Sequence, residues 1–134
     1  MTLALPGSLQ REGWRIDAWV DTAPPIAWPD GVSTCVLDLD LAGREANVRD
    51  VEAGDRIRPL GMRGTKGVHD ALAEIGVPAH LRGTRPIVTA GAGATIREGE
   101  PLWVVGYRVD DRVRVRAATT RFLWLAAARD EEAS

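Results

Sequence analysis

Residues 56–78 read RIRPLGMRGTKGVHDALAEIGVP and join two patterns that together decide the fold. The second half places apolar residues at the i, i+3, i+4 and i+7 spacing of an amphipathic helix over about 68–75. Thr65 is a candidate N-cap for this helix, and Gly76 followed by Pro78 ends it. Its apolar positions are Val68, Ala71, Leu72 and Ile75. The segment therefore predicts one short helix that packs on a sheet and is entered through a loop.

That loop is basic and contains glycine. Residues 56–66 carry Arg56, Arg58, Arg63 and Lys66, with glycines at positions 61 and 64. Glycine lets a backbone approach a ligand closely, and the free N–H groups of a helix start favour an anion. The pattern indicates an anion site, although a solvated surface turn explains a basic loop equally well.

The distribution of charge supports a focused site. The formal net charge is −2, which does not favour a general nucleic-acid binder. Between residues 56 and 85, six Lys and Arg side chains face only two acids, Asp70 and Glu74. This local balance of +4 leaves −6 for the rest of the chain. A basic segment on an acidic body can present an anion site that the overall charge conceals.

Strand patterns dominate the remainder of the 134 residues. Alternation or short apolar runs predict strands at 14–21, 33–41, 46–51, 85–90 and 101–110, with strand structure continuing through 111–127. In 108–116 the arginines at 108, 112, 114 and 116 alternate with valines, which is typical of a sheet face open to water. The fold class is α+β, sheet-dominated, with one or two short helices. The predicted core includes Val68, Leu72, Ile75, Val104, Val109, Val113 and Val115.

Several single residues have a structural explanation that outweighs a chemical one. Cys35 lies in a strand pattern and is expected to be buried. Trp14 and Trp103 occupy core-type strand positions. Trp19 and Trp28 are either exposed stacking platforms or core residues, and core packing is favoured.

No catalytic, metal or cofactor motif is found. The string GMRGTKG lacks the Gly-Lys-Ser/Thr ending of a P-loop. His69 and His80 have no metal-ligand spacing. Asp38 and Asp40 share one face of a predicted strand, where exposed acids are the usual explanation. No apolar run approaches the ~18 residues of a membrane helix, and no signal peptide is found, so the cytoplasm is the expected location.

The order of residues in 54–88 and 101–115 resembles the C-terminal domain of bacterial tRNA(Ile)-lysidine synthetase. The match spans about residues 46–116, and the combination is specific although each piece alone is weak. The matching positions are Gly54, Asp55, Arg56, Arg58, Pro59, Leu60, Gly61, Lys66, Asp70, Leu72, Val77, Pro78, Arg82, Pro86, Trp103, Val104, Gly106, Arg108, Asp110 and Arg112.

The resemblance implies a three-layer α+β domain, of a type shared with phenylalanyl-tRNA synthetase, at residues 46–125. A strand-rich segment (1–45) precedes it and an acidic tail (126–134) follows. Enzymes of the family use ATP to attach lysine to an anticodon cytidine, through an S-G-G-x-D-S loop that this sequence lacks. The implied role is non-catalytic tRNA binding, with isoleucine tRNA and a catalytic domain, in cis or in trans, as partners. The implied RNA contacts are Arg56, Arg58, Arg63, Lys66, Arg82, Arg108 and Arg112.

A second hypothesis is a protein-interaction or scaffold domain that keeps the fold without RNA binding. Under the first hypothesis the basic residues bind phosphates, and under the second they stabilise the domain.

Overall fold

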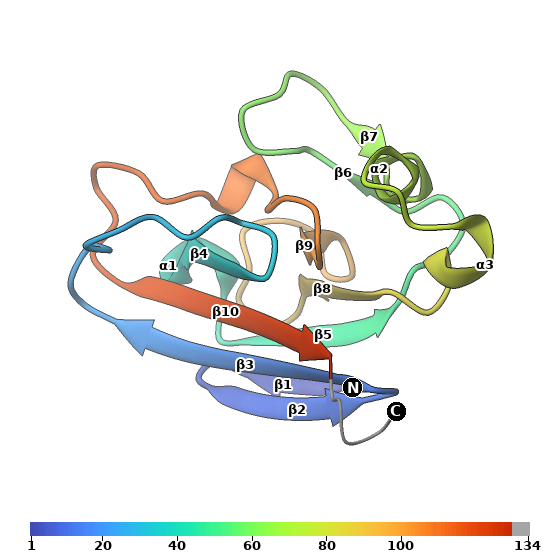
Figure 1. Cartoon of the computed structure of the whole chain (residues 1–134). Coiled ribbons are helices and arrows are strands. Elements are labelled where there is room, and N and C mark those ends of the chain that lie inside the picture. Colours follow the sequence, from blue (N-terminus) through green and yellow to red (C-terminus); the bar gives the residue numbers. More distant parts are fainter. Residues whose placement is uncertain (130–134) are drawn as a thin grey trace.

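The computed structural model describes residues 1–129 (Figure 1). The larger strands form two four-stranded antiparallel sheets, in the orders β1-β5-β8-β9 and β2-β3-β10-β4. The strands of these sheets are β1 (Thr2–Ala4), β2 (Gly7–Arg11), β3 (Trp14–Asp21), β4 (Thr34–Asp38), β5 (Glu45–Asp50), β8 (Pro86–Ala90), β9 (Pro101–Val104) and β10 (Phe122–Arg129). The shorter elements are α1 (Leu39–Ala42), β6 (Arg56–Ile57), β7 (Lys66–Gly67), α2 (Val68–Glu74), α3 (Ala79–Arg82) and the 3-10 helix η1 (Asp111–Val113).

The two large sheets pack face to face around the main core. Ile16 on β3 and Leu123 on β10 belong to one apolar cluster with Val48 on β5 and Val88 on β8. The cluster draws on residues before and after position 45, so these parts of the chain share a core. The boundary at residue 45 stays a prediction.

A third layer covers the β8–β9 part of the other face of the β1-β5-β8-β9 sheet. Helix α2 buries Val68 and Leu72 in a second cluster that includes Ile87 of β8 and Val104 of β9. All five residues of β8 are buried, because this strand has a packed layer on each side. In Figure 1, α2 and the β6–β7 pair lie on the far side of this sheet from β3 and β10. The expected three-layer, sheet-dominated α+β fold is confirmed.

The limits of α2 differ from the predicted ones. Residues 66–67 pair with 56–57 as β7 and β6, so Gly67 rather than Thr65 is the N-cap. Ile75 is the C-cap and is 40% exposed, so its predicted place in the core is wrong. Gly76, with φ +85°, then turns the chain back, and the N–H of Val77 donates to the carbonyl of Leu72 (2.9 Å).

The predicted strand through 108–116 is also wrong. β9 ends at Val104, and Gly106 with φ +88° makes a turn before the chain enters η1. Val109 and Val113 are buried as expected, but Val115 is only half-buried. The valine–arginine alternation matches a strand by spacing, yet a turn and a helix cap interrupt it.

The predicted strand at 33–41 ends earlier, at Asp38, because this side chain caps α1. Its Oδ1 accepts from the N–H of Leu41 (3.2 Å), and its Oδ2 accepts from the Thr119 hydroxyl (2.7 Å). Asp40 therefore lies on α1 and does not share a strand face with Asp38, which corrects the expectation. Its carboxylate pairs with Arg121.

The tryptophans are divided between the core and the surface. Trp103 is fully buried and its Nε1–H donates to the carbonyl of Gly31 (3.1 Å), as a buried indole requires. Trp14, expected in the core, is only half-buried. Trp19 stacks on Trp124 with 5.8 Å between ring centroids and remains 42% exposed. Trp28 is 66% exposed, so core packing was the wrong choice for it and for Trp19.

Two sequence expectations concern the chain's ends and its cysteine. β10 runs to Arg129, so the start of the acidic tail expected at 126–134 is strand, while residues 130–134 lie outside the described residues.

Cys35 is buried as expected, and burial raises the pKa of its thiol well above the usual value.

Leu72, which is buried, and Ile75, which is exposed, provide a test of how α2 packs on the sheet. Leu72→Ala should lower the free energy of unfolding by about 2–5 kcal/mol, because it leaves a cavity between α2 and the sheet. Ile75→Ala, on the exposed end of the same segment, should lower it by less than about 1 kcal/mol. Urea denaturation of both variants measures the difference. Equal losses would mean that α2 is rotated relative to this structure.

Candidate nucleic-acid interface

The base of the basic loop is fixed by the carboxylate of Asp110, whose side chain is fully buried. Its Oδ2 accepts from the backbone N–H of Arg58 (3.1 Å) and from Arg112 Nη2 (3.0 Å). Its Oδ1 accepts from the backbone N–H of Arg112 (2.9 Å) and from Arg112 Nε (3.0 Å). A buried carboxylate needs such donors, because an unpaired one would be costly. Asp110 thus joins the start of the loop to η1.

Backbone hydrogen bonds reinforce this junction. The N–H of Leu60 donates to the carbonyl of Val109 (3.0 Å), and the N–H of Asp111 donates to the carbonyl of Arg58 (2.7 Å). Pro59 and Asp110 form an isolated antiparallel bridge. The segment 58–60 therefore lies as a short extra strand against 109–111.

Asp55 makes a second anchor on the other side of the loop. Both its oxygens accept from Arg49 of β5, at 2.8 Å each, and Oδ2 accepts from the N–H of Glu52 (2.7 Å). Burial raises the pKa of Asp55, but these hydrogen bonds and the Arg49 charge outweigh it, so the pKa of Asp55 lies below its usual value. The carbonyl of Asp55 also accepts from the N–H of Val68 (2.8 Å), which fixes the start of α2.

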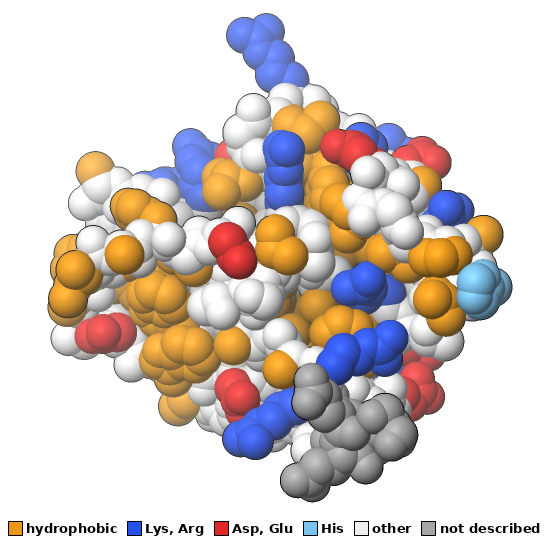
Figure 2. Space-filling model, in the orientation of Figure 1, with side chains coloured by type: hydrophobic (Ala, Val, Ile, Leu, Met, Phe, Trp, Pro, Cys, Tyr) orange, Lys and Arg blue, Asp and Glu red, His pale blue; other side chains and the backbone are white. Residues whose placement is uncertain are grey.

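Two arginines of the loop keep free guanidinium groups. Arg58 and Arg63 are exposed, and neither guanidinium has a hydrogen-bond or ion-pair partner within residues 1–129. Gly61 and Gly64, with φ +80° and +73°, shape the turn that carries Arg63 outward. Figure 2 shows Lys and Arg side chains along the upper edge of the molecule, where Figure 1 places this loop.

The other two basic residues of the loop are partly engaged. Arg56 Nε donates to the Thr65 hydroxyl (3.0 Å), which links β6 to the end of the loop. Lys66 forms an ion pair with Glu74 of α2. Both contacts are at the surface, where such pairs contribute little and exchange readily with solvent or ligand.

The three remaining predicted RNA contacts differ in how strongly their side chains are held by other groups of the domain. Arg108 is exposed, lies 5.6 Å from the Tyr107 ring centroid, and donates to the Leu60 carbonyl (3.4 Å), so it belongs to the same surface as the loop. Arg82 lies on α3 and donates through Nε to the Val77 carbonyl (2.9 Å). Arg112 is held by Asp110 and, through Nη1, by Glu100 (3.2 Å), so it mainly positions the loop base.

The start of α2 is not the anion site that the sequence suggested. The helix has seven residues, Gly67 provides no side-chain cap, and Asp70 brings a carboxylate into the first turn. The N–H of Val68 is already bonded to Asp55. The positive character of this region therefore comes from side chains on the loop rather than from a helix end.

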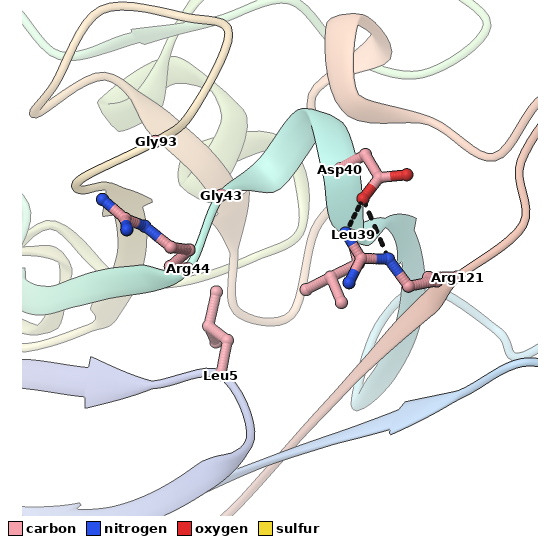
Figure 3. Close-up of a pocket in the computed structure, with 7 residues that line it drawn as sticks. All are labelled: Leu5, Leu39, Asp40, Gly43, Arg44, Gly93 and Arg121. Atoms are coloured by element: carbon pink, nitrogen blue, oxygen red, sulfur yellow. Dashed lines mark hydrogen bonds and ion pairs between the residues drawn. The ribbon is translucent and has the colours of Figure 1, made fainter.

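A pocket of about 310 Å³ lies between α1 and the loop before β9 (Figure 3). Its one carboxylate, Asp40, is paired with Arg121, and Arg44 points toward Gly93. The lining offers no nucleophile or free base for catalysis. Within residues 1–129, no three His, Cys, Asp or Glu side chains gather where they could hold a metal ion.

Two features of the structure were missed by sequence reasoning. Asp110 was matched to the family pattern without a role, although an Asp before a short helix is a common N-cap. Arg85 and Arg129 both contact the Trp14 ring. No local sequence pattern predicts that Arg129 lies near Arg85 and Trp14.

The structure defines a three-layer α+β domain that presents a firmly anchored basic loop. A family described as "TilS substrate C-terminal domain" matches residues 46–124. The chain belongs to this family, whose members are C-terminal domains of tRNA(Ile)-lysidine synthetase.

Relatives and a solved structure agree with this assignment. A tRNA(Ile)-lysidine synthase from Caldanaerobacter subterraneus subsp. tengcongensis is 36% identical over 90% of this chain and 25% of the relative. One from Dehalococcoides mccartyi is 30% identical over 81% of this chain and 23% of the relative. The chain thus spans about a quarter of the length of these relatives. A crystal structure of a TILS C-terminal domain superposes with a TM-score of 0.78 over 96% of both chains at 23% identity, which supports the fold.

The Asp110 anchor provides a stability test. Asp110→Asn removes the charge while nearly preserving the shape, and leaves the half-buried Arg112 guanidinium with Glu100 as its carboxylate partner. The free energy of unfolding should fall by about 1–3 kcal/mol, because buried hydrogen bonds to a charged acceptor are lost while the Arg112 charge stays partly exposed and paired. The matched control is Asp111→Asn, which affects a partly exposed pair with Arg114 and should cost less than about 1 kcal/mol. Denaturant melts of the two variants compare them, and similar losses would contradict the assigned role of Asp110.

The Asp55 anchor predicts a pH dependence. Because its folded pKa is depressed, the contribution of Asp55 to stability is present above the unfolded value of about 3.9 and is lost as pH falls through the folded pKa. The stability difference between the wild type and Asp55→Asn should therefore be largest near pH 7 and shrink below about pH 4. Urea melts from pH 7 to pH 3 measure it. A difference that stays constant with pH would show that the Asp55–Arg49 charge pair is not its source.

Proposed function

We propose that this chain is a non-catalytic tRNA-binding domain of a tRNA(Ile)-lysidine synthetase, with the loop at 56–66 as its main phosphate-contacting surface. The observation that carries the proposal is the pair of exposed arginines, Arg58 and Arg63, whose charges are free on a loop held at its base by two carboxylates. Membership in the lysidine-synthetase family supports tRNA as the ligand.

Preorganisation of the loop favours RNA binding. A flexible basic loop would lose conformational entropy when it binds, whereas this one is already fixed through Asp110 and Asp55. The anchoring carboxylates are neutralised by Arg112 and Arg49, so they repel an approaching phosphate only weakly. The free arginines can then exchange their counterions for RNA phosphates, which provides most of the affinity.

The seven proposed contacts have different roles. Arg58, Arg63 and Arg108 meet phosphates directly, and Arg56 and Lys66 join once their surface partners release them. Arg82 extends the surface onto α3. Arg112 acts mainly by holding Asp110 and hence the loop.

The chemical step belongs to a partner. We assign attachment of lysine to the anticodon cytidine, and the ATP that it requires, to a catalytic domain that acts in cis or in trans in the cytoplasm. This chain then takes no cofactor and contributes affinity and placement of isoleucine tRNA. None of the helices within residues 1–129 is long and apolar enough to span a membrane.

One observation favours the second candidate, a protein-interaction domain. The outer face of β3 and β10 and the loop after β3 expose Trp19, Ile26 and Trp28. Figure 2 shows hydrophobic side chains gathered where β3 ends. This face has no excess of positive charge, since Arg15 is paired with Asp17 and Asp21 adds a carboxylate. Such a face suits contact with protein, for which the catalytic domain is the candidate. The two functions use different faces and are compatible.

The tRNA proposal predicts a loss of salt-sensitive binding. Arg58→Ala with Arg63→Ala should weaken binding of isoleucine tRNA and flatten the log–log salt dependence by about 0.7–0.9 per lost phosphate contact. Fluorescence anisotropy with labelled tRNA at several salt concentrations measures both quantities. The melting temperature should stay nearly unchanged, because neither side chain has a partner in residues 1–129.

A matched control removes the same charge elsewhere. Arg44→Ala with Arg97→Ala changes two exposed arginines outside the proposed surface and should leave the salt slope intact. Equal weakening by both double variants would indicate non-specific attraction. An unchanged slope in the loop variant would exclude the loop from the RNA interface and favour the protein-interaction alternative.

A further inference from the structure

A second basic site lies apart from the loop, around Trp14 at the start of β3. The guanidinium carbon of Arg129 lies 4.8 Å from the Trp14 ring centroid, and that of Arg85 lies 5.3 Å from it. Arg85 directly precedes β8, and Arg129 ends β10, so the two come from different sheets. One indole ring thus holds two positive charges close together.

No carboxylate balances these charges within residues 1–129. Three other half-buried arginines, Arg11, Arg49 and Arg112, pair with Asp50, Asp55 and Asp110. Those aspartates help to raise the pKa of each of the three guanidinium groups. For Arg85 the direction is opposite, because burial and the nearby Arg129 both lower its pKa. The protein thus keeps two like charges together without a counterion, an arrangement that an anion would relieve.

The two arginines line a pocket of about 180 Å³. Its other walls include Pro78 and two partly exposed apolar residues, Ile75 and Leu81, which are 40% and 41% exposed. By volume it holds about six water molecules at ~30 Å³ each, which is enough for the five heavy atoms of a phosphate group. In Figure 2, Lys and Arg side chains are visible on the face between α3 and the end of β10.

The guanidinium groups retain donors for an anion. The Arg129 guanidinium makes no hydrogen bond within the described part of the chain, and that of Arg85 makes one long contact, from Nη1 to the Val105 carbonyl (3.5 Å). Each guanidinium has five N–H donors, and contact with an aromatic face does not consume them. Gly106 leaves the space for Arg85, since a Cβ there would lie 2.8 Å from Arg85 Nη1.

We propose that Arg85, Arg129 and Trp14 form a phosphate-binding pocket, separate from the basic loop. The two guanidinium groups bind the phosphate oxygens, and the indole holds both groups in place without adding negative charge that would compete with the ligand. A phosphate of the RNA backbone and the phosphate of a mononucleotide share this chemistry. The RNA source rests on the proposed function, whereas binding of phosphate itself does not.

The experiment is a titration with inorganic phosphate at low ionic strength, followed by ¹⁵N NMR of the Trp14 indole and arginine Nε–H signals. The expected result is a saturable shift of the Trp14, Arg85 and Arg129 signals. Arg129→Ala should weaken phosphate binding at least about tenfold, equivalent to 1.4 kcal/mol. Because Arg129 is exposed, this variant should keep its melting temperature.

Control variants separate this site from general charge effects. Arg97→Ala removes an exposed arginine elsewhere and should leave phosphate binding unchanged. Arg85→Lys keeps the charge of the more buried partner and should retain part of the affinity. Asp130, Glu131 and Glu132 follow Arg129 in the sequence, so the titration is repeated with these three neutralised, to remove competing carboxylates.

Two further ligands identify the source of the phosphate. Adenosine monophosphate that binds at least tenfold tighter than phosphate would indicate a nucleotide site. A salt slope for tRNA that falls by about 0.7–0.9 in Arg129→Ala would indicate an RNA backbone contact. No saturable shift with phosphate, in the wild type or the neutralised variant, would overturn the proposal and leave the arginines as structural partners of Trp14. The loop can fail its tRNA test while this pocket binds phosphate, so the two proposals can be separated.

Discussion

The buried carboxylate of Asp110 is the constraint on which the functional surface depends. It accepts four hydrogen bonds, from the backbone at Arg58 and from the backbone and side chain of Arg112. These donors belong to segments far apart in the sequence, so one side chain fixes the loop relative to η1 and β9. A neutral residue could not satisfy these donors equally well, because both oxygens of the carboxylate accept here, whereas an amide side chain has only one accepting oxygen.

The arginines of this domain fall into two groups that differ in their partners rather than in their sequence context. Arg49 and Arg112 neutralise Asp55 and Asp110 and serve the fold. Arg58 and Arg63 extend from the segment that those pairs hold and have free charges. The division matters for binding. A structural ion pair makes the fold more rigid, but its positive charge is cancelled by the carboxylate and therefore attracts a phosphate only weakly. The positive potential therefore comes from residues that contribute little to stability.

The sequence predicted most of the architecture and the position of the loop. The strand at 14–21 and the buried face of α2 follow from simple periodicity, since each element packs one face against a sheet. Periodicity failed at 108–116, because the φ of Gly106 and the cap made by Asp110 turn the chain before a strand can form. It failed at Ile75 for a related reason, since the helix ends one residue earlier and exposes that side chain. Which arginines are free could not be predicted, because their partners are distant in sequence.

Burial of the β1-β5-β8-β9 sheet on both faces restricts where a ligand can bind. One face is covered by the β2-β3-β10-β4 sheet, and the β8–β9 part of the other face is covered by α2 and the β6–β7 pair, so these areas are not open to a ligand. Around β8 and β9, free charged groups therefore lie on loops and at strand ends. The basic segment from 56 to 85 consequently does not form one patch. Its loop residues lie beside η1, whereas Arg85 lies beside Arg129 at the end of β10. Basic residues that are close together in the sequence thus lie on two surfaces, with α2 and α3 between them. Each surface must be tested with its own variants.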